Sequence, residues 1–321
     1  MRKLFTCRHA SVKLGHFCAG FLFGISTGLI KVALHEGQNT QKSTPIYAEG
    51  DFTKNMRKLT GTNTELELKN TRVMCIFYKK RAVNLLHQLR IARRSWTNKC
   101  TSVLVFIDSY NRTIPAVSFD RLPNWVKISQ SNLITGLRYV FGNHFHDADW
   151  FFISRGIPYV IMENLRHFLS NQDNSNAVYW GHKLKRRTFV KEVIYPDDFA
   201  GIALSKQALY RLGTRGQYQR VCNEVDTTEG IMFSMCMAGL GIRFGDTRDG
   251  ENKSRFLLYS PGSYLDDNLP VTPWLEDLEL GLSRPSTLIS SSLISFGRAP
   301  VSRYPGFTYT IHNLITISNE T

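Results

Sequence analysis

Residues 147–169 read DADWFFISRGIPYVIMENLRHFL, and the order of elements in this stretch decides the fold. The apolar run 150–153 is typical of a buried strand, and the glycine and proline within 154–158 predict a turn directly after it. The apolar residues beyond the turn recur at helical spacing: Val160, Ile161, Leu165, Phe168 and Leu169. Many α/β enzymes hold a ligand where a strand passes through a turn into a helix. The stretch therefore predicts an α/β domain with a ligand site at 154–158.

The chain before this stretch predicts a strand, a helix and a second strand. Residues 72–78 (RVMCIFY) and 103–107 (VLVFI) are apolar runs typical of buried strands. Between them, 81–96 predicts a helix with four core-facing residues: Val83, Leu86, Leu89 and Ile91. This is the spacing of a βαβ unit with a right-handed crossover in a parallel sheet. Further elements are predicted as strands at 126–128 and 178–181, a strand passing into a helix at 202–212, and helices at 133–145 and 229–240.

The chain has 321 residues and a formal net charge of +14. Its length suffices for one large domain or two small ones with a well-buried core. The basic residues lie in short clusters spread along the chain, at 79–81, 90–94 and 183–187. A protein that binds nucleic acid usually gathers such residues into one patch with aromatic platforms. The sequence therefore argues against a nucleic-acid partner and leaves an acidic or phosphate-bearing partner, or solubility alone, to explain the charge.

Residues 14–34 form an apolar run of about 20 residues, enough to span a bilayer. The positive-inside rule keeps the amino terminus in the cytosol because four basic residues precede the run: Arg2, Lys3, Arg8 and Lys13. A cleaved signal peptide is the alternative, but the run is longer than a usual signal-peptide core and no clean cleavage site follows. The sequence predicts a cytosolic tail at 1–13, a type II signal-anchor at 14–34, a polar stem at 35–70, a lumenal domain at 71–300 and a C-terminal tail at 301–321.

Four cysteines lie outside the predicted tail and anchor: Cys75, Cys100, Cys222 and Cys236. An even number in an oxidising compartment predicts two disulfides. Proximity in sequence favours the pairs Cys75–Cys100 and Cys222–Cys236, although four cysteines permit three pairings. Three N-x-S/T sequons would accept glycans in the same compartment, at Asn111, Asn252 and Asn319. Both features support a domain in the secretory lumen.

Several short segments, in this order, resemble one known family. They read WTNKC at 96–100, DADWF at 147–151, ENLR at 163–166, LSK at 204–206 and GDTRD at 245–249. Their order and spacing are similar to those of the core 1 β1,3-galactosyltransferase family, part of glycosyltransferase family 31, over nearly the whole predicted lumenal domain.

The resemblance implies a GT-A fold, which is a Rossmann-like mixed sheet flanked by helices, in a type II membrane protein of the Golgi or endoplasmic reticulum. It also implies transfer of galactose from UDP-galactose, with Mn²⁺, to GalNAc on Ser or Thr. That reaction makes core 1, the T antigen, of mucin-type O-glycans. The two favoured cysteine pairs also resemble the family's disulfides.

The chain departs from the family at the metal-binding turn. A GT-A transferase holds a divalent cation on an Asp-x-Asp turn, because oxygen donors suit manganese and the metal neutralises charge on the leaving UDP. The positions of the family's three acidic residues are Arg155, Gly156 and Ile157 here. The cation at Arg155 opposes a metal, so no cofactor is expected, and Mn²⁺ and UDP-galactose are expected only if the chain is active. Alternatively, Arg155 could pair with a diphosphate in place of the metal.

Three further family positions can be carried over. Glu229 and Gly230 stand where the family has the acidic pair that supplies its candidate general base. Gly297 stands where it has its remaining metal-binding histidine, and 198–199 where it has two glycines that face the acceptor. The resemblance leaves Glu229 as a candidate catalytic residue, although a carboxylate at a helix start can equally be a partner of the helix dipole.

The remaining acidic candidates have competing structural explanations. Asp246, Arg248 and Asp249 are either substrate contacts or a loop-fixing ion pair. Asp147 and Asp149 match a bare Asp-x-Asp pattern, but they precede the strand and so lie at the wrong end for the site. These two are predicted to be surface or capping residues.

Two functions compete. The first is a catalytically impaired family member that acts as a partner or chaperone of an active one. It is favoured because losing even one preorganised charge partner can cost on the order of 10²-fold in rate. The family's dedicated chaperone has likewise lost the Asp-x-Asp turn, and its Trp-Phe-Phe strand resembles 150–152. The second function is an active galactosyltransferase with altered metal use. The expected partner is an active core 1 galactosyltransferase or a second copy of the chain.

Overall fold

The computed structural model describes residues 70–79, 83–127, 129–187, 192–223, 228–265 and 289–313, all of which belong to one unit, Thr60–Thr321. The predicted cytosolic tail and signal-anchor, nearly all of the stem, and Asn319 lie outside the described residues. Within the described part of the chain, no helix has the length and apolar character needed to cross a membrane.

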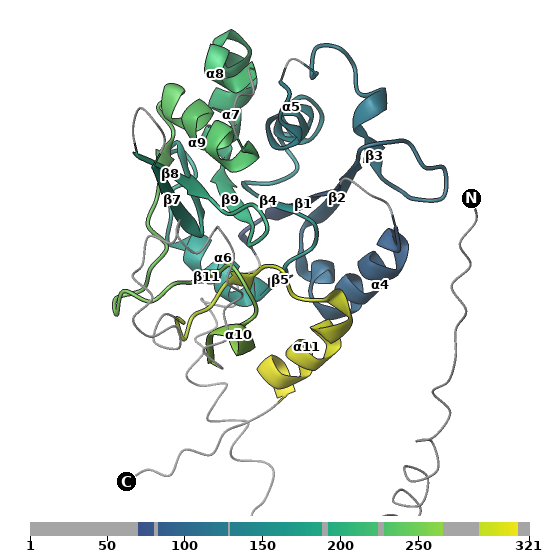
Figure 1. Cartoon of the computed structure of the whole chain (residues 1–321), viewed down its shortest axis with the longest axis vertical. Coiled ribbons are helices and arrows are strands. Elements are labelled where there is room, and N and C mark those ends of the chain that lie inside the picture. The colour runs from purple at the N-terminus through teal and green to yellow at the C-terminus, as the bar shows by residue number, and fades with distance from the viewer. Residues whose placement is uncertain are drawn as a thin grey trace, which may run out of the picture. The chain divides into compact units, whose positions relative to one another are not determined.

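A mixed sheet of seven strands forms the centre of the domain (Figure 1). Its strands are β1 (Val73–Lys79), β2 (Ser102–Ile107), β3 (Val117–Ser118), β4 (Trp150–Arg155), β6 (Val178–Gly181), β9 (Ile202–Ser205) and β10 (Arg243–Phe244). They lie in the order β10-β6-β9-β4-β1-β2-β3. β3, β2, β1 and β4 pair in parallel, whereas β9 is antiparallel to both β4 and β6. This mixed sheet flanked by helices is consistent with a GT-A fold.

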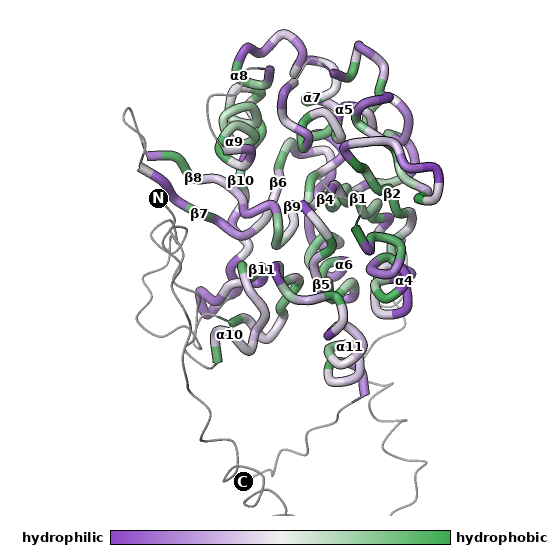
Figure 2. Tube along the Cα trace, turned by 45° about the vertical axis from the view of Figure 1, so that its right-hand side comes forward, coloured by the Kyte–Doolittle hydropathy of each residue, from purple (hydrophilic) through white to green (hydrophobic). Residues whose placement is uncertain are grey.

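Helices cover both faces of the sheet. Successive side chains of β1 point to opposite sides, so they pack into two separate cores. Met74 and Ile76 lie in a core with three helices, α5 (Asn132–His144), α7 (Lys206–Arg215) and α9 (Glu229–Gly239). Cys75 and Phe77 lie in the opposite core, with α4 (Leu85–Ser95), α6 (Met162–Ser170) and α11 (Tyr304–Asn313). Figure 2 shows hydrophobic residues gathering along the central strands.

Two smaller sheets flank the main one. β7 (Lys183–Arg187) and β8 (Glu192–Pro196) form an antiparallel hairpin. A three-stranded sheet has the order β11 (Phe256–Leu257), β12 (Ser295–Phe296), β5 (Tyr159–Val160). The short helices are η1 (Thr97–Lys99), η2 (Phe119–Arg121), η3 (Gly216–Tyr218), α8 (Arg220–Asn223), α10 (Pro261–Leu265) and η6 (Val301–Arg303).

The predicted βαβ unit is present, with β1 and β2 parallel and α4 between them. The core assignment of Val83 is wrong, because this residue precedes α4 and is 69% exposed. Asn84 has a left-handed conformation (φ 54°), so the helix begins only after this residue. Val103 is 42% exposed, so β2 is buried only over its second half.

The predicted strand at 126–128 is wrong over the residues described. Residues 124–127 form a turn in which the Val126 N–H donates to the carbonyl of Pro123. A proline followed by an asparagine favours such a turn. The third parallel strand is β3 instead. The helix predicted after residue 158 starts at Met162, two residues after the first apolar residue assigned to it. That residue, Val160, belongs to β5 instead.

Both predicted disulfides are confirmed. Cys75 in β1 is bonded to Cys100, and Cys222 in α8 is bonded to Cys236 in α9. The first joins the central sheet to the segment that follows α4. The second holds α8 against α9, whose first residue, Glu229, faces the pocket described below.

Helix α11 holds the turn that follows β4. Tyr304, its first residue, is fully buried, and its hydroxyl donates to the carbonyl of Ile157. The ring of Tyr159 packs edge-on against those of Tyr304 and Phe307, with centroids 5.3 and 5.6 Å away. The backbone after Arg155 is therefore fixed by a helix close to the end of the described chain.

Candidate functional site

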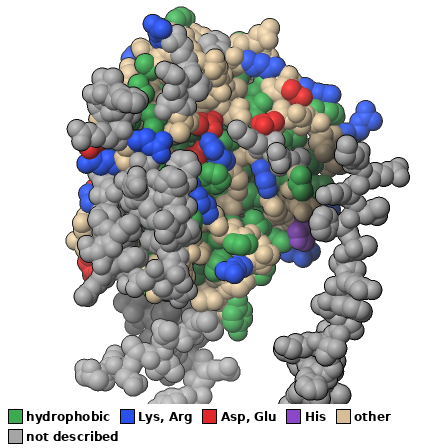
Figure 3. All heavy atoms as spheres, viewed as in Figure 1, with side chains coloured by type: hydrophobic (Ala, Val, Ile, Leu, Met, Phe, Trp, Pro, Cys, Tyr) green, Lys and Arg blue, Asp and Glu red, His purple; other side chains and the backbone are tan. Residues whose placement is uncertain are grey.

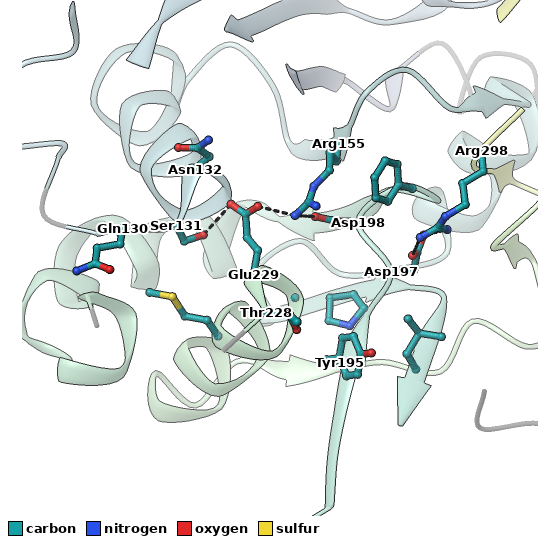
Figure 4. A pocket seen from close by; sticks show the side chains of 15 residues that line it. Gln130, Ser131, Asn132, Arg155, Tyr195, Asp197, Asp198, Thr228, Glu229 and Arg298 are labelled. Carbon is teal, nitrogen blue, oxygen red and sulfur yellow. Dashed lines mark hydrogen bonds and ion pairs between the residues drawn. The ribbon is translucent and has the colours of Figure 1, made fainter. Parts of the chain in front are cut away.

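A pocket of about 400 Å³ lies at the carboxyl end of β4. Its walls come from the start of α5, the start of α9, the turn between β8 and β9, and the segment after β12 (Figure 4). The charged residues that line it are Arg155, Asp197, Asp198, Glu229 and Arg298. The carboxyl ends of strands are where open α/β sheets bind ligands. The pocket thus occupies the position that the sequence predicts for the site.

Two carboxylates hold the Arg155 guanidinium. Its Nη2 lies 2.9 Å from Asp198 Oδ2 and 2.6 Å from Glu229 Oε2. Its Nε donates to the Tyr78 hydroxyl at 3.4 Å. Burial lowers the pKa of Arg155, but the charge of Asp198, the contact with Tyr78 and the charge of Glu229 together raise it above its ordinary value. Arg155 stays charged, and that charge is balanced within the protein.

Glu229 joins this arginine to the start of another helix. As the first residue of α9 it sends its carboxylate to the amino terminus of α5, where Oε1 accepts the Leu133 N–H at 2.8 Å. The Ser131 hydroxyl donates to the same oxygen at 3.2 Å, and Oε2 accepts from Arg155. A carboxylate at a helix amino terminus satisfies N–H groups that have no partner within the helix. Glu229 therefore caps a neighbouring helix, in addition to starting its own.

Asp198 is a buried carboxylate at the centre of the network. It accepts hydrogen bonds from the Tyr78 hydroxyl and from Arg155. Burial raises the pKa of the Asp198 carboxyl to about 6; the charge of Arg155 opposes this shift, and those of Asp197 and Glu229 add to it. Burial also raises the pKa of Tyr78 well above its usual range, so its hydroxyl stays protonated and donates.

A second ion pair lies beside the first. Arg298 Nη2 is 2.7 Å from Asp197 Oδ2. The guanidinium of Arg298 also lies 4.4 Å from the centroid of the Phe199 ring, and that of Arg155 lies 5.2 Å from it. The β8–β9 turn thus holds one arginine from β4 and another from the segment after β12. Figure 3 shows acidic and basic side chains side by side on one face of the molecule.

Gly230 and Gly297, which replace an acidic residue and a histidine of the family, lie where the backbone leaves no room for a side chain. A Cβ on Gly230 would lie 2.8 Å from the carbonyl oxygen of Pro196. A Cβ on Gly297 would lie 2.8 Å from the backbone carbonyl of Phe199. Cβ atoms do not approach backbone this closely without movement of the chain. A carboxylate at 230 or an imidazole at 297 therefore does not fit this backbone.

The three residues at the positions of the family's metal-binding turn, Arg155 to Ile157, lie in different surroundings. Arg155 faces the pocket, whereas Ile157 is buried in the core next to α11 and does not line the pocket. Gly156 between them has φ +77°, a conformation that favours glycine.

The donor set does not fit Mn²⁺. Each carboxylate that lines the pocket is paired with an arginine, and the Arg155 guanidinium lies between two of them. Across the described ranges, no three or more His, Cys, Asp or Glu side chains are grouped so as to hold a metal ion.

The other predicted residues lie outside the pocket. Asp246 and Arg248 form an ion pair, which lowers the pKa of the Asp246 carboxyl, and Asp249 accepts the backbone N–H groups of 251 and 253. These contacts fix the loop that carries them. Asp149 pairs with Arg72, and both aspartates of the 147–149 pattern precede β4, at the end opposite Arg155.

The sequence did not single out three members of the network: Tyr78, Asp197 and Arg298. Two consecutive aspartates directly after a strand ending in Pro196 were a signal that could have drawn attention to the β8–β9 turn. Nothing near Arg298 in the sequence points to its partner, because Asp197 lies 101 residues earlier in the chain.

The chain is similar in sequence to two glycosyltransferases. No protein-family model matches the chain. It is 29% identical over 197 residues, 61% of its length, to the glycoprotein-N-acetylgalactosamine 3-beta-galactosyltransferase 1 of Xenopus laevis, and the match covers 53% of that protein. It is 23% identical over 156 residues, 48% of its length, to a beta-1,3-glucosyltransferase of Mus musculus, of which the match covers 31%. The chain thus spans about half of the first relative and about a third of the second.

A mixed sheet flanked by helices, with a pocket at the carboxyl end of β4, is consistent with a glycosyltransferase-like domain. The likeness to the two relatives supports membership of glycosyltransferase family 31.

Proposed function

We propose that the chain is a catalytically impaired member of its family that acts as a partner or chaperone of an active member in mucin-type O-glycosylation. The network of Arg155, Asp198 and Glu229 carries this proposal. Where a metal would hold a sugar-nucleotide diphosphate, the chain places a guanidinium that its own carboxylates neutralise. A diphosphate that enters must separate these pairs and meet two negative charges. The pocket therefore lacks the preorganised stabilisation that a leaving diphosphate requires.

The domain is proposed to lie in the lumen of the endoplasmic reticulum or Golgi, behind the type II anchor at 14–34. The two disulfides support this location, since such bonds persist in oxidising compartments. The proposed partner is an active core 1 galactosyltransferase or a second copy of this chain. The named activity of the Xenopus relative supports the first.

Calorimetry of the purified chain with UDP, with and without Mn²⁺, tests the catalytic half of the proposal. A radiolabelled galactose-transfer assay on a GalNAc-peptide accompanies it. We expect neither manganese-dependent UDP binding nor transfer. Manganese-dependent binding together with turnover would refute the impaired state.

Depletion of the chain from cells tests the other half. The activity of the endogenous core 1 galactosyltransferase should fall and should recover on re-expression of the chain. Re-expression of Glu251→Gln is the matched control, because Glu251 is an exposed residue outside the pocket. Unchanged activity after complete depletion, with no co-purification of the enzyme, would refute the partner role.

An active galactosyltransferase with altered metal use is the second candidate. The observation in its favour is that two guanidinium groups, those of Arg155 and Arg298, line the pocket. Cations can stabilise a leaving diphosphate without a metal. Metal-independent transfer that is lost in Arg155→Gln but kept in Arg248→Gln, outside the pocket, would establish this candidate.

A further inference from the structure

Two of the three sequons lie in the described residues, and the structure distinguishes them. The sequon at 111–113 lies between β2 and β3, and the one at 252–254 lies between β10 and β11. A glycosylation acceptor belongs on the surface, where the transferase can reach both the asparagine and the hydroxyl residue. Only the first sequon meets this condition in the folded domain.

Asn111 and Thr113 form a hydrogen-bonded turn in the folded domain. Asn111 Oδ1 accepts the Thr113 N–H at 2.9 Å and the Thr113 hydroxyl at 2.7 Å. This is an Asx turn closed by the hydroxyl of the sequon itself. Thr113 is exposed and Asn111 is half-buried. The asparagine and the hydroxyl residue of this sequon therefore lie together in one turn of a surface segment.

The second sequon has an accessible asparagine but an inaccessible hydroxyl. Asn252 is exposed, with φ +65°. Ser254 is only 5% exposed, and its hydroxyl donates to the carbonyl of Phe256 at 2.6 Å. The Ser254 carbonyl accepts the Ser290 N–H at 3.1 Å, which ties it to the segment before β12. Reaching this hydroxyl requires the start of β11 to open.

We propose that Asn111 carries an N-linked glycan that can be attached to the folded domain, whereas Asn252 is modified only before its segment folds. The co-substrate is a lipid-linked oligosaccharide diphosphate. Asn111 Nδ2 bonds to the anomeric carbon while the bond from that carbon to the diphosphate oxygen breaks. The lipid diphosphate leaves with the electron pair, and a base of the transferase takes one amide proton. The inference rests on the lumenal location in the proposed function.

The full chain expressed in secretory cells provides the test. Mass spectrometry after enzymatic deglycosylation in heavy water measures the occupancy of each asparagine, and protease protection of microsomes reports the compartment independently. We expect high occupancy at Asn111, with loss of its glycan in both Asn111→Gln and Thr113→Ala. We expect low occupancy at Asn252, rising when a dithiothreitol pulse delays disulfide formation. The matched variant Ser254→Ala should abolish that rise.

The outcomes separate this inference from the proposed function. A protected domain in which Asn111 is unmodified would overturn the inference and leave the proposed function intact. A domain that the protease digests would overturn both. Occupancy of Asn252 that equals that of Asn111 without dithiothreitol would overturn the distinction between the two sequons.

Discussion

Arg155 ends β4 with a positive charge at a position where the resemblance to the core 1 family implies a carboxylate. Asp198 and Glu229 bind this charge, and Asp197 binds that of Arg298. Three carboxylates and two guanidinium groups leave one excess negative charge when all are ionised (3 − 2 = 1). A further anion is therefore disfavoured in the pocket, which supports the proposed impairment at the scale of residues.

Glu229→Gln should destabilise the protein by about 1–2 kcal/mol, because the amide keeps an acceptor for the start of α5 but loses the charge that faces Arg155. Asp198 remains to hold the arginine, which limits the loss. Urea unfolding of the variant beside Glu251→Gln measures the effect. Equal stability of the two variants would contradict a structural role for Glu229.

Asp198→Asn should change how stability depends on pH. The folded pKa of Asp198 is raised to about 6, above an unfolded value of about 4. A group with a raised pKa contributes its full stability below the unfolded value and loses that contribution as the pH rises through the folded value. The free energy of unfolding of the wild type, relative to Asp198→Asn, should fall by about 2 kcal/mol between about pH 4 and pH 7. A difference that stays constant over this range, measured by urea unfolding, would rule out the raised pKa.

At the scale of elements, the antiparallel strand β9 brings the network together. Because β9 runs opposite to β4, the turn that precedes β9 lies at the carboxyl end of β4. That turn carries Asp197 and Asp198 to the pocket, while α5 and α9 place their starts on the other side. The segment after β12 passes close to the same turn, where Gly297 contacts its backbone.

Gly297→Ala should destabilise the protein by about 1–3 kcal/mol, because its Cβ would press on the backbone of Phe199. Gly306→Ala is the matched control, since a Cβ at Gly306 in α11 meets nothing within 4 Å. This control should be stabilised by about 0.5–1 kcal/mol, because alanine favours the helix. Thermal melting of both variants measures the contrast, and a Gly297→Ala protein as stable as the wild type would contradict the close approach.

At the scale of the whole molecule, a mixed sheet consistent with a GT-A fold carries a pocket whose charged side chains are paired with one another. The paired groups come from the end of β4, the β8–β9 turn, the start of α9 and the segment after β12. This arrangement is the whole-molecule basis of the proposed impaired function.

The double variant Arg155→Asp, Ile157→Asp should not transfer galactose. It restores two acidic residues of the turn, but positions 230 and 297 still lack the other groups, and Asp at 157 would replace a side chain buried in the core. The transfer assay with Mn²⁺ measures this, and thermal melting of the double variant and of Arg155→Asp alone shows whether they fold. Manganese-dependent transfer by either variant would mean that Gly230 and Gly297 are not real losses.

The sequence predicts the long elements well and the contacts between distant elements poorly. β1, β4, α5 and α9 are long enough for a continuous or periodic apolar pattern, and each lies close to its predicted range. β3, β5, β11 and β12 have two residues each, too few to form any pattern. At the site, Arg155 and Glu229 were both singled out through the resemblance to the family. Their ion pair and the pair Asp197–Arg298 depend on how the elements pack, which no local pattern encodes.

The tight backbone around Gly230 and Gly297 also limits how this pocket could be redesigned. A metal site of the kind that the resemblance implies needs acidic residues in the turn, a second carboxylate beside Glu229 and an imidazole at 297. Two of these changes place a new side chain against backbone that lies within 3 Å of its Cβ. Each would lower stability before it supplied a metal ligand, so engineering a metal site here would require the surrounding backbone to be remodelled first.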